Sequence, residues 1–327
     1  MIKTFKKLVA ASAIATAVLG SQVSVADVYP SKPLSIVVPF NPGGGVDTVA
    51  RIIADNLRES LGADVIVENK PGGSGMIGAN AVAKAAPDGY TVLLGSAGET
   101  AINEFVYKEK MRYSPTDDLA PVTLVTRIPN VMVLSPKIPA NNVAEFVEYV
   151  KENPGVTYAT SGIGNSQHLN GALLAGMAGL EMIQIPYKGA SKQLVDVASG
   201  DVDLTFVSYT SARSFITDGK VKALAITAAE RAPFDKNIPA IAEYAPLGNY
   251  QLENWFGMFA PAGTPADVLE KLNAAVVKAL NNPELATKLQ NMGGQPAPMS
   301  VSEFTSFLKT ERKQFAEIVE KAGISVR

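Results

Sequence analysis

The amino-acid sequence predicts an α/β protein of two lobes, with a hinge and a cleft between them. Short apolar runs alternate along the chain with stretches of helical periodicity, which is typical of sheets covered by helices. This alternation occurs in two separate series, the second of which begins near Leu119. The last helices have no strands of their own and are expected to return to the first series, so the chain crosses twice between the two units.

The first series contains three predicted strands and two helices. One helix runs to about Leu61, and another starts at about Met76. Strands that alternate with helices in this way favour a parallel sheet with helices on both faces. The predicted strands are "LSIVVPF", "DVIVEN" and "TVLLGS".

The second series repeats this alternation and predicts another α/β unit. Its predicted strands are "VTLVTR", "VMVLSP", "VTYAT", "EMIQIPYK", "VDLTFVS" and "VKALAIT". Its helices are expected over Val143 to Lys151, from Gln167, from Ser191 and near Ala212.

The C-terminal part of the chain predicts the hinge. "ENWFGMFAPAGTP" is typical of a strand with a turn, and amphipathic helices are expected over residues 266–281 and 301–322. Because these helices must pack on an existing sheet, we place them on the first unit. The predicted crossings lie near residues 122–133 and 249–259. The lobes are therefore expected at residues 27–126 with 250–327, and at residues 127–249.

Residues 1–26 predict a secretory signal peptide. Lys3, Lys6 and Lys7 precede the apolar run "LVAASAIATAVLG", and "SVA" at residues 24–26 is suited to cleavage. The apolar run is shorter than the roughly 20 residues that a membrane-spanning helix needs. We therefore expect an exported protein whose mature chain starts at Asp27.

The composition argues against several kinds of chemistry. The chain has no Cys and a single His, so disulfides, thiolate nucleophiles and the common zinc sites cannot be built. The lack of these ligands means that we expect no metal to bind. The chain carries 29 basic and 31 acidic residues, and loss of the signal-peptide lysines makes the mature chain more acidic still. Because a nucleic-acid partner requires a basic surface, we expect no nucleic acid to bind either.

The segment "PFNPGGGVD" predicts an anion-binding loop. A strand ends at Phe40, and Gly43, Gly44 and Gly45 allow a ligand to approach the backbone where a helix begins. Free amides and the helix dipole favour a negative group at such a point. Asp47 would compete with a bound anion, so we assign it to fixing the loop. The alternative is a tight turn that binds nothing.

A similar loop, "YATSGIGNSQHL", occurs in the second unit. Ser161, Asn165 and Ser166 offer neutral hydrogen-bond donors, and the amides around Gly162 and Gly164 are unobstructed. Two such loops, one in each lobe, predict a ligand held between them.

A third glycine segment, "PGGSGMIG", matches the dinucleotide-binding fingerprint through Gly73, Gly75 and Gly78. That fingerprint expects an acidic residue at the end of the next strand, where this chain has Ser96 and Ala97. We therefore expect no nicotinamide or flavin cofactor.

Ser166 and His168 raise the alternative of an exported hydrolase that acts on a carboxylate ester. The chain has no Gly-x-Ser-x-Gly elbow, and a nucleophile needs an oriented base with its own acidic partner. His168 at the start of a helix is more often a packed or capping histidine. Asp201 and Asp203 alternate at a strand entry, so one of them could face the cleft.

Five segments together resemble a known family. They are "VVPFNPGGGVDTVARIIADNL", "VIVENKPGGSGMIGANAVAKAAPDGYTVLLGS", "DLAPVTLVTRIPNVMVLSP", "QIPYKGASKQLVDVASGDVDLTF" and "FGMFAPAGTP". In this order they are similar to the solute receptors of tripartite tricarboxylate transporters, the Bordetella uptake gene or TctC-type family. The resemblance implies a periplasmic binding protein of the type II class, with no enzymatic activity and no cofactor, that delivers an organic anion to membrane permease subunits. We expect it to be a monomer.

The resemblance also implies where the carboxylate is held, mainly by backbone amides and neutral side chains of the loops between the lobes. Glu99 and Glu104 depart from the family's usual residues and could reshape the wall of the first lobe. Lys188 could approach a second carboxylate, or it could be an ordinary solvated lysine. The predicted ligand-binding residues are Phe40, Asn41, Gly43, Gly44, Gly45, Ser96, Ala97, Ser161, Gly162, Gly164, Asn165, Ser166, His168 and Asp203.

Overall fold

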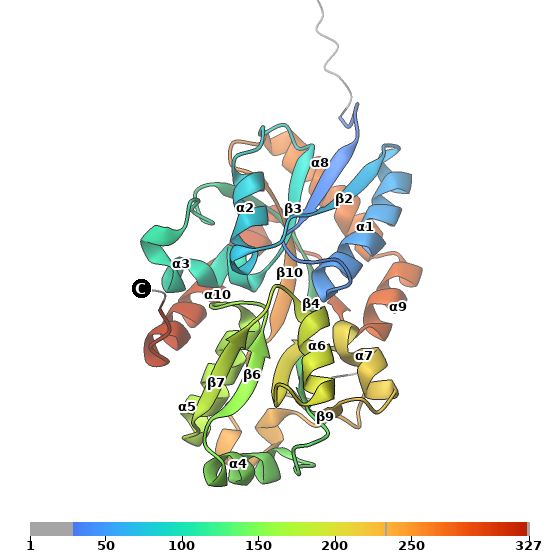
Figure 1. Cartoon of the computed structure of the whole chain (residues 1–327). Coiled ribbons are helices and arrows are strands. Elements are labelled where there is room, and N and C mark those ends of the chain that lie inside the picture. The colour runs from blue at the N-terminus through green and yellow to red at the C-terminus, as the bar shows by residue number, and fades with distance from the viewer. Residues whose placement is uncertain (1–28, 233, 326–327) are drawn as a thin grey trace, which may run out of the picture.

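Two β-sheets form the centres of two lobes, which lie one above the other in Figure 1. The computed structural model describes residues 29–232 and 234–325, so the predicted signal peptide lies outside the described residues. We call the lobe around the six-stranded sheet the first lobe, and the lobe around the five-stranded sheet the second lobe.

The sheet of the first lobe has the strand order β11-β4-β10-β3-β1-β2. β1 pairs in parallel with β2 and β3, whereas β10 is antiparallel to β3 and β4, and β11 is antiparallel to β4. The strands are β1 (Leu34–Val38), β2 (Val65–Asn69), β3 (Thr91–Ser96), β4 (Leu119–Ile128), β10 (Asn254–Pro261) and β11 (Gln295–Pro296).

Helices cover both faces of this sheet because its strands are apolar on both sides. Ile36 and Val38 face α1, α8 and α9, while Val37 faces α2 and α10. The helices are α1 (Gly45–Leu61), α2 (Met76–Ala83), α3 (Asn103–Val106), α8 (Ala266–Leu280), α9 (Pro283–Asn291) and α10 (Val301–Lys321). Two short helical turns, η1 (Gly73–Gly75) and η2 (Gly98–Ile102), lie near the second lobe.

The sheet of the second lobe has the order β7-β6-β8-β5-β9. β6 pairs in parallel with β7 and β8, and β5 is antiparallel to β8 and β9. α4 and α5 cover one face, and α6 and α7 cover the other. The elements are β5 (Asn130–Leu134), α4 (Val143–Glu152), β6 (Val156–Thr160), α5 (Ser166–Ala178), β7 (Met182–Pro186), α6 (Ala190–Ser199), β8 (Leu204–Ser208), α7 (Tyr209–Thr217) and β9 (Lys222–Ile226).

The chain crosses between the lobes at two adjacent places. Between β4 and β5 it passes through Pro129, and it returns between Tyr250, which packs in the core of the second lobe, and the start of β10. Thr227, directly after β9, links the two crossings. Its amide donates to the Asn130 carbonyl (2.9 Å), its Oγ1 accepts from the Asn130 amide (3.0 Å), and its carbonyl accepts from the Leu252 amide (3.1 Å). Two adjacent segments of this kind form a hinge.

The structure corrects three predictions. The segment "VTLVTR", predicted as a strand of the second unit, lies in β4 of the first lobe's sheet, between β10 and β11. The sheets are mixed rather than parallel, because β4 carries the chain out of the first lobe and β10 brings it back beside β4 in the opposite direction. The helix α9 was not expected, although Asn282 caps it by accepting from the amides of Glu284 and Leu285. The late helices α8 and α10 do pack on the first lobe, as predicted.

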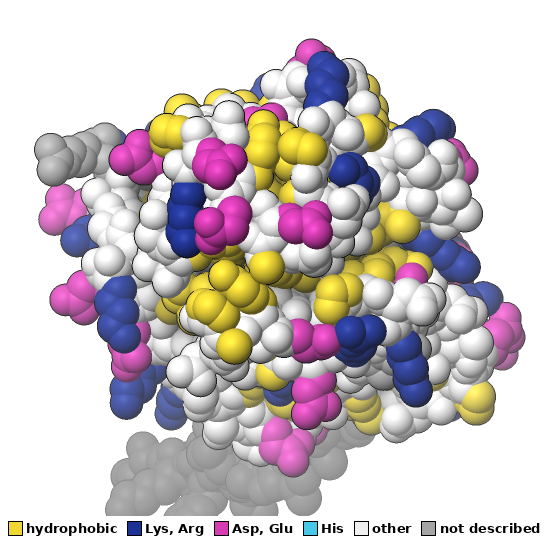
Figure 2. All heavy atoms as spheres, turned by 90° about the horizontal axis from the view of Figure 1, so that it is seen from below, with side chains coloured by type: hydrophobic (Ala, Val, Ile, Leu, Met, Phe, Trp, Pro, Cys, Tyr) yellow, Lys and Arg dark blue, Asp and Glu magenta, His cyan; other side chains and the backbone are white. Residues whose placement is uncertain are grey.

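The surface seen from below carries a mixture of side-chain types. Basic and acidic side chains are interspersed on it with apolar ones (Figure 2). Within the ranges 29–232 and 234–325, no helix combines the length and the apolar character needed to cross a bilayer.

Candidate ligand-binding site

A cavity lies between the two lobes. Its lining consists of backbone, amide, hydroxyl and apolar groups, with no Lys, Arg, His, Asp or Glu among its described residues. The lining residues are Phe40, Asn41, Gly44, Gly45, Val46, Ser96, Asn130, Ser161, Asn165, Ser166, Gln167, Gly189, Ala190, Ser208, Ser211, Asn254 and Phe256.

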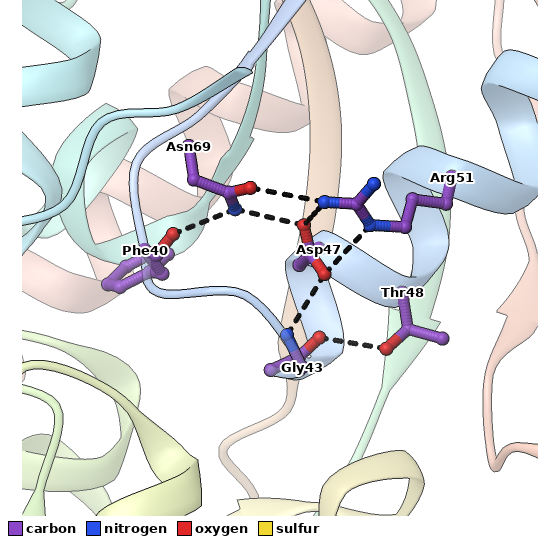
Figure 3. A network of polar contacts seen from close by, with 7 residues as sticks. Phe40, Gly43, Asp47, Thr48, Arg51 and Asn69 are labelled. Carbon is purple, nitrogen blue, oxygen red and sulfur yellow. Dashed lines mark hydrogen bonds and ion pairs between the residues drawn. The ribbon is translucent and has the colours of Figure 1, made fainter. Parts of the chain in front are cut away.

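The loop before α1 is fixed by a charged network (Figure 3). The Asp47 carboxylate accepts hydrogen bonds from the Gly43 amide at 2.9 Å and from the Arg51 guanidinium at 2.9 and 3.1 Å. Asn69 Nδ2 donates to Asp47 and to the Phe40 carbonyl. Burial alone would raise the pKa of Asp47, but the hydrogen bonds outweigh it and hold this pKa below its ordinary value. Asp47 thus fixes the loop, as predicted.

The start of α1 offers free amides to the cavity. The first hydrogen bond of the helix runs from the Thr48 amide to the Gly44 carbonyl at 3.0 Å, so the preceding amides have no partner within the helix. Those of Gly44, Gly45 and Val46 find no other acceptor in the described part of the chain. The positive end of the helix dipole also lies here, and together they favour an anion.

Gly45 allows the two lobes to approach each other. A Cβ atom at this position would lie 2.5 Å from Ser208 Oγ and 3.4 Å from the ring of Phe256. Ser208 belongs to the second lobe, so a larger residue at position 45 would hold the lobes apart.

The start of α5 presents a second group of donors. Asn165 Oδ1 caps the helix by accepting from the His168 amide at 3.0 Å. The amides of Ser166 and Gln167 have no acceptor among the described residues. Asn165 is only 4% exposed, and its Nδ2 has no hydrogen-bond partner in the described chain, so it is a third donor.

Two further helices start at the same cavity. Gly189 and Ala190 begin α6, whereas Ser208 and Ser211 lie at the start of α7 with their hydroxyls 3.0 Å apart. Neither helix start was predicted as part of the site, although "YKGAS" and "FVSYTS" each span the end of a predicted strand. The positive ends of four helix dipoles therefore converge on one uncharged cavity.

Asparagine side chains close the hinge side of the cavity. Asn130 is 1% exposed, its Oδ1 has no partner among the described residues, and its Nδ2 lies 3.5 Å from Ser166 Oγ. Asn254, at the start of β10, lines the same side. No sequence pattern predicted these asparagines, because their positions depend on how the two crossings meet.

The lobes touch each other on the side of the glycine loops. Tyr107 of the first lobe donates to the Ile163 carbonyl of the second at 3.1 Å, and its hydroxyl lies 2.9 Å from Ser74 Oγ. A Cβ at Gly98 would lie 3.2 Å from Cβ of Asn165. The structure therefore has its lobes closed around the cavity.

Comparisons with known proteins decide the family. Residues 49–324 match the sequence profile described as "Tripartite tricarboxylate transporter family receptor". The chain belongs to this receptor family. It is 36% identical over 315 residues, 96% of this chain and 93% of the relative, to a UPF0065 protein from the tcbD-tcbE intergenic region of Pseudomonas sp. strain P51.

Solved structures agree with this membership. The receptor resembles Rpa4515 of R. palustris with adipate at 34% identity and a TM-score of 0.88, over 91% of this chain and all of the other. It resembles MatC of Rhodopseudomonas palustris with bound malate at 30% identity and a TM-score of 0.83, over 89% and 100% of the two chains. The matched family is one of receptors, not of enzymes.

The receptor's cavity contains some of the predicted ligand-binding residues and omits others. The Gly43 amide donates to the Asp47 carboxylate, and Ala97 lies in the apolar core. Gly162 lies beside Ser74 in a neighbouring depression, and the Gly164 amide donates to His168 Nδ1 at 3.1 Å. The predicted residues that line the cavity are Phe40, Asn41, Gly44, Gly45, Ser96, Ser161, Asn165 and Ser166.

His168 has a structural role in the receptor. Its Nδ1 accepts from the Gly164 amide, and its ring lies 6.2 Å from that of Tyr158. Burial lowers the pKa of His168 to about 4, so the ring is neutral at pH 7. Ser166 Oγ has Asn130 Nδ2, not His168, as its hydrogen-bond partner, so the pair that prompted the hydrolase alternative is not assembled.

Asp203 lies outside the cavity. Its Oδ2 accepts from the Thr157 amide at 2.8 Å and from Thr157 Oγ1 at 2.7 Å. It comes directly before β8, whereas the cavity lies after the other end of that strand, at Ser208. The strand's length therefore separates Asp203 from the cavity.

Lys188 lines the neighbouring depression rather than the cavity. This depression also contains Tyr107 and the loop Gly72 to Gly75, and it shares Phe40 and Ser161 with the cavity.

Within residues 29–232 and 234–325, no group of three or more His, Cys, Asp or Glu side chains is suited to hold a metal ion.

Proposed function

We propose that this receptor captures a small organic carboxylate between its lobes in the periplasm and delivers it to the permease subunits of a tripartite tricarboxylate transporter. The convergence of four helix starts on an uncharged cavity supports the proposal. Unpaired amides and dipoles bind an anion without a cationic side chain.

We infer that the ligand is a dicarboxylate, with a tricarboxylate or an aromatic acid as alternatives. Two similar proteins were solved with adipate and with malate, and both acids are dicarboxylates. Ligand contacts are proposed for Phe40, Asn41, Gly44, Gly45, Ser96, Ser161, Asn165 and Ser166, together with Asn130, Gln167, Gly189, Ala190, Ser208, Ser211 and Asn254.

The organisation of the chain is part of the same proposal. We propose export through residues 1–26, a monomeric mature protein, and lobes at residues 27–126 with 250–327 and at residues 127–249. The strands support this division, since β1 to β4, β10 and β11 share one sheet and β5 to β9 share the other. Each boundary moves slightly from these values, because β4 ends at Ile128 and Tyr250 packs in the core of the second lobe.

A thermal-shift screen followed by titration calorimetry tests the proposed function. Adipate, malate, citrate and benzoate are tested beside adipamide, which has the length of adipate without its charges. Binding of an acid at 100 times its Kd is expected to stabilise the protein by about 2.7 kcal/mol, whereas adipamide is expected to have no effect. Hydrolysis of the methyl esters without binding of any acid would contradict the proposal.

A further inference from the structure

A carboxyl group lies buried directly behind the cavity. Glu99, in η2, has no exposed surface. Ser96, which lines the cavity, donates to Glu99 twice, from its amide to Oε1 and from its hydroxyl to Oε2, the latter at 2.7 Å. One side chain therefore separates Glu99 from a bound ligand.

No cation neutralises Glu99 within the described residues. β3, η1, α2, α3 and α10 pack against η2, and the first three carry no titratable side chain. Glu104 of α3 and Arg312 of α10 pair with each other at 3.1 Å. Tyr113 donates its hydroxyl to the Glu99 carbonyl, and His168 across the cleft is neutral.

In this environment both the protonated and the ionised form of Glu99 are populated near neutral pH. Burial without a counter-ion raises the pKa of Glu99 to about 7, although the two hydrogen bonds from Ser96 oppose the shift. Ligand binding can therefore shift the balance between the two states.

The two states present different faces of Ser96 to the cavity. An ionised Glu99 is an acceptor only, so it holds the Ser96 hydroxyl proton away from the cavity. A neutral Glu99 can donate to Ser96 Oγ, which frees the hydroxyl proton to point at a ligand. Only when Glu99 is neutral can the Ser96 hydroxyl donate to a bound carboxylate. Protonation of Glu99 also removes a negative charge from behind the site.

We propose that Glu99 is a positioning residue that must be protonated for tight carboxylate binding, so that the receptor takes up one proton as it binds its ligand. This inference rests on the proposed function. It assigns to Glu99 an effect on affinity that is transmitted through Ser96, without contact between Glu99 and the ligand.

Titration calorimetry at pH 6, 7 and 8 tests the proposal, with adipate and malate as probes and two buffers of different ionisation enthalpy. If only the neutral form binds, the apparent Kd rises about tenfold between pH 6 and pH 8, because the competent fraction falls by that factor. Proton uptake is expected to be about one per ligand at pH 8 and close to zero at pH 6. This measurement needs no variant.

Two variants locate the effect. The side-chain amide of Glu99→Gln can donate to Ser96 Oγ and accept from the Ser96 amide, so it imitates the neutral acid. The Kd of this variant at pH 8 is expected to match that of the wild type at pH 6, without proton uptake.

Glu104→Gln is the matched control, because Glu104 is also a largely buried carboxyl but faces Arg312. It is expected to keep the wild-type pH dependence.

The outcomes separate the two proposals. A wild-type affinity that is constant from pH 6 to pH 8, or a tenfold dependence that persists in Glu99→Gln, would overturn the role of Glu99 and leave the proposed function intact. Failure of every acid to bind either protein would overturn the proposed function and this inference with it.

Discussion

The two loops that face the cavity are fixed by opposite means. In the first lobe the anchor is ionic, since Asp47 pairs with Arg51, whose side chain is 52% exposed. In the second lobe it is neutral: Gln167 Oε1 accepts from the Ser161 amide and from Gln193 Nε2, and Gln193 also bonds Ser161 Oγ at 2.9 Å.

This difference follows from solvent access. Arg51 reaches water and keeps part of its hydration, so its pairing with Asp47 avoids the cost of burying two charges. Gln193 has no exposed surface, and an ion pair there would lose both hydration shells. Both solutions leave the cavity lining uncharged, so a bound anion would depend on amides and dipoles.

Breaking the ionic anchor is expected to have the largest effect. Asp47→Asn weakens charge-assisted hydrogen bonds to a buried side chain, and we expect the free energy of unfolding to fall by about 2 kcal/mol in urea denaturation. Asp55→Asn is the control on the same helix. Its partner is Arg58, but Asp55 is 71% exposed, so a loss below about 0.5 kcal/mol is expected. Equal losses in both variants would contradict the special role of Asp47.

The same anchor is expected to be sensitive to acid. The pKa of Asp47 is lower in the folded protein than in the unfolded chain, so its ionised form stabilises the fold above about pH 4, the ordinary range of an Asp, and this stabilisation is lost as the pH falls through the folded-state pKa. The difference in unfolding free energy between wild type and Asp47→Asn should thus be constant from pH 7 to 5 and smaller at pH 3. If this difference grew on acidification, the pKa of Asp47 would be raised rather than lowered in the folded protein, which would contradict its role as an ionised anchor.

Gly45→Ala tests the contact between the lobes. The added Cβ would meet Ser208 and Phe256, so we expect at least a tenfold loss of affinity for the strongest-binding acid, about 1.4 kcal/mol, in calorimetry. Gly176→Ala is the control, because no atom lies within 4 Å of its Cβ position on the exposed part of α5. Unchanged affinity in Gly45→Ala would show that closure does not need this approach.

Breaking the neutral anchor is expected to have a smaller effect. Gln167→Ala leaves the Ser161 amide without its acceptor, and we expect a loss of about 1 kcal/mol in unfolding free energy. Because no titratable group takes part, the loss should be the same at pH 7 and at pH 5. A loss that changes with pH would mean that the second loop also depends on a charge.

Salt is expected to have the smallest effect. Because the cavity lining carries no charge and the lobes close over it, the Kd of the bound acid should rise by less than about twofold between 0.05 and 0.5 M NaCl. A tenfold rise would point to an exposed cation such as Lys188 as the main contact.

The sequence predicted the loops better than the cavity as a whole. Most strands and helices followed from periodicity, although α3, α9 and β11 did not, and the starts of α1 and α5 followed from glycines after buried strands. Pairing direction could not be predicted, because β10 reaches β4 only after the chain has formed the second lobe. Asn130 and Asn254 could not be found either, since each enters the cavity through contact between distant segments.

Glycine alone was a poor guide to ligand contact. Gly43 and Gly164 were predicted to bind the ligand through their backbone amides, but those amides donate to Asp47 and His168. Ser208 and Gly189 have the same relation of strand end to helix start without a glycine run. The useful signal was therefore a helix that starts directly after a strand, as at α1, α5, α6 and α7.

A crystal structure of the complex with the strongest-binding acid tests most directly whether a neutral cradle holds the carboxylate. We predict carboxylate oxygens at about 2.7–3.2 Å from amides at the starts of α1 and α5, including those of Gly45 and Ser166, with no Lys or Arg side chain in contact. A carboxylate held by Lys188 or by an arginine, with these amides unoccupied, would contradict the account.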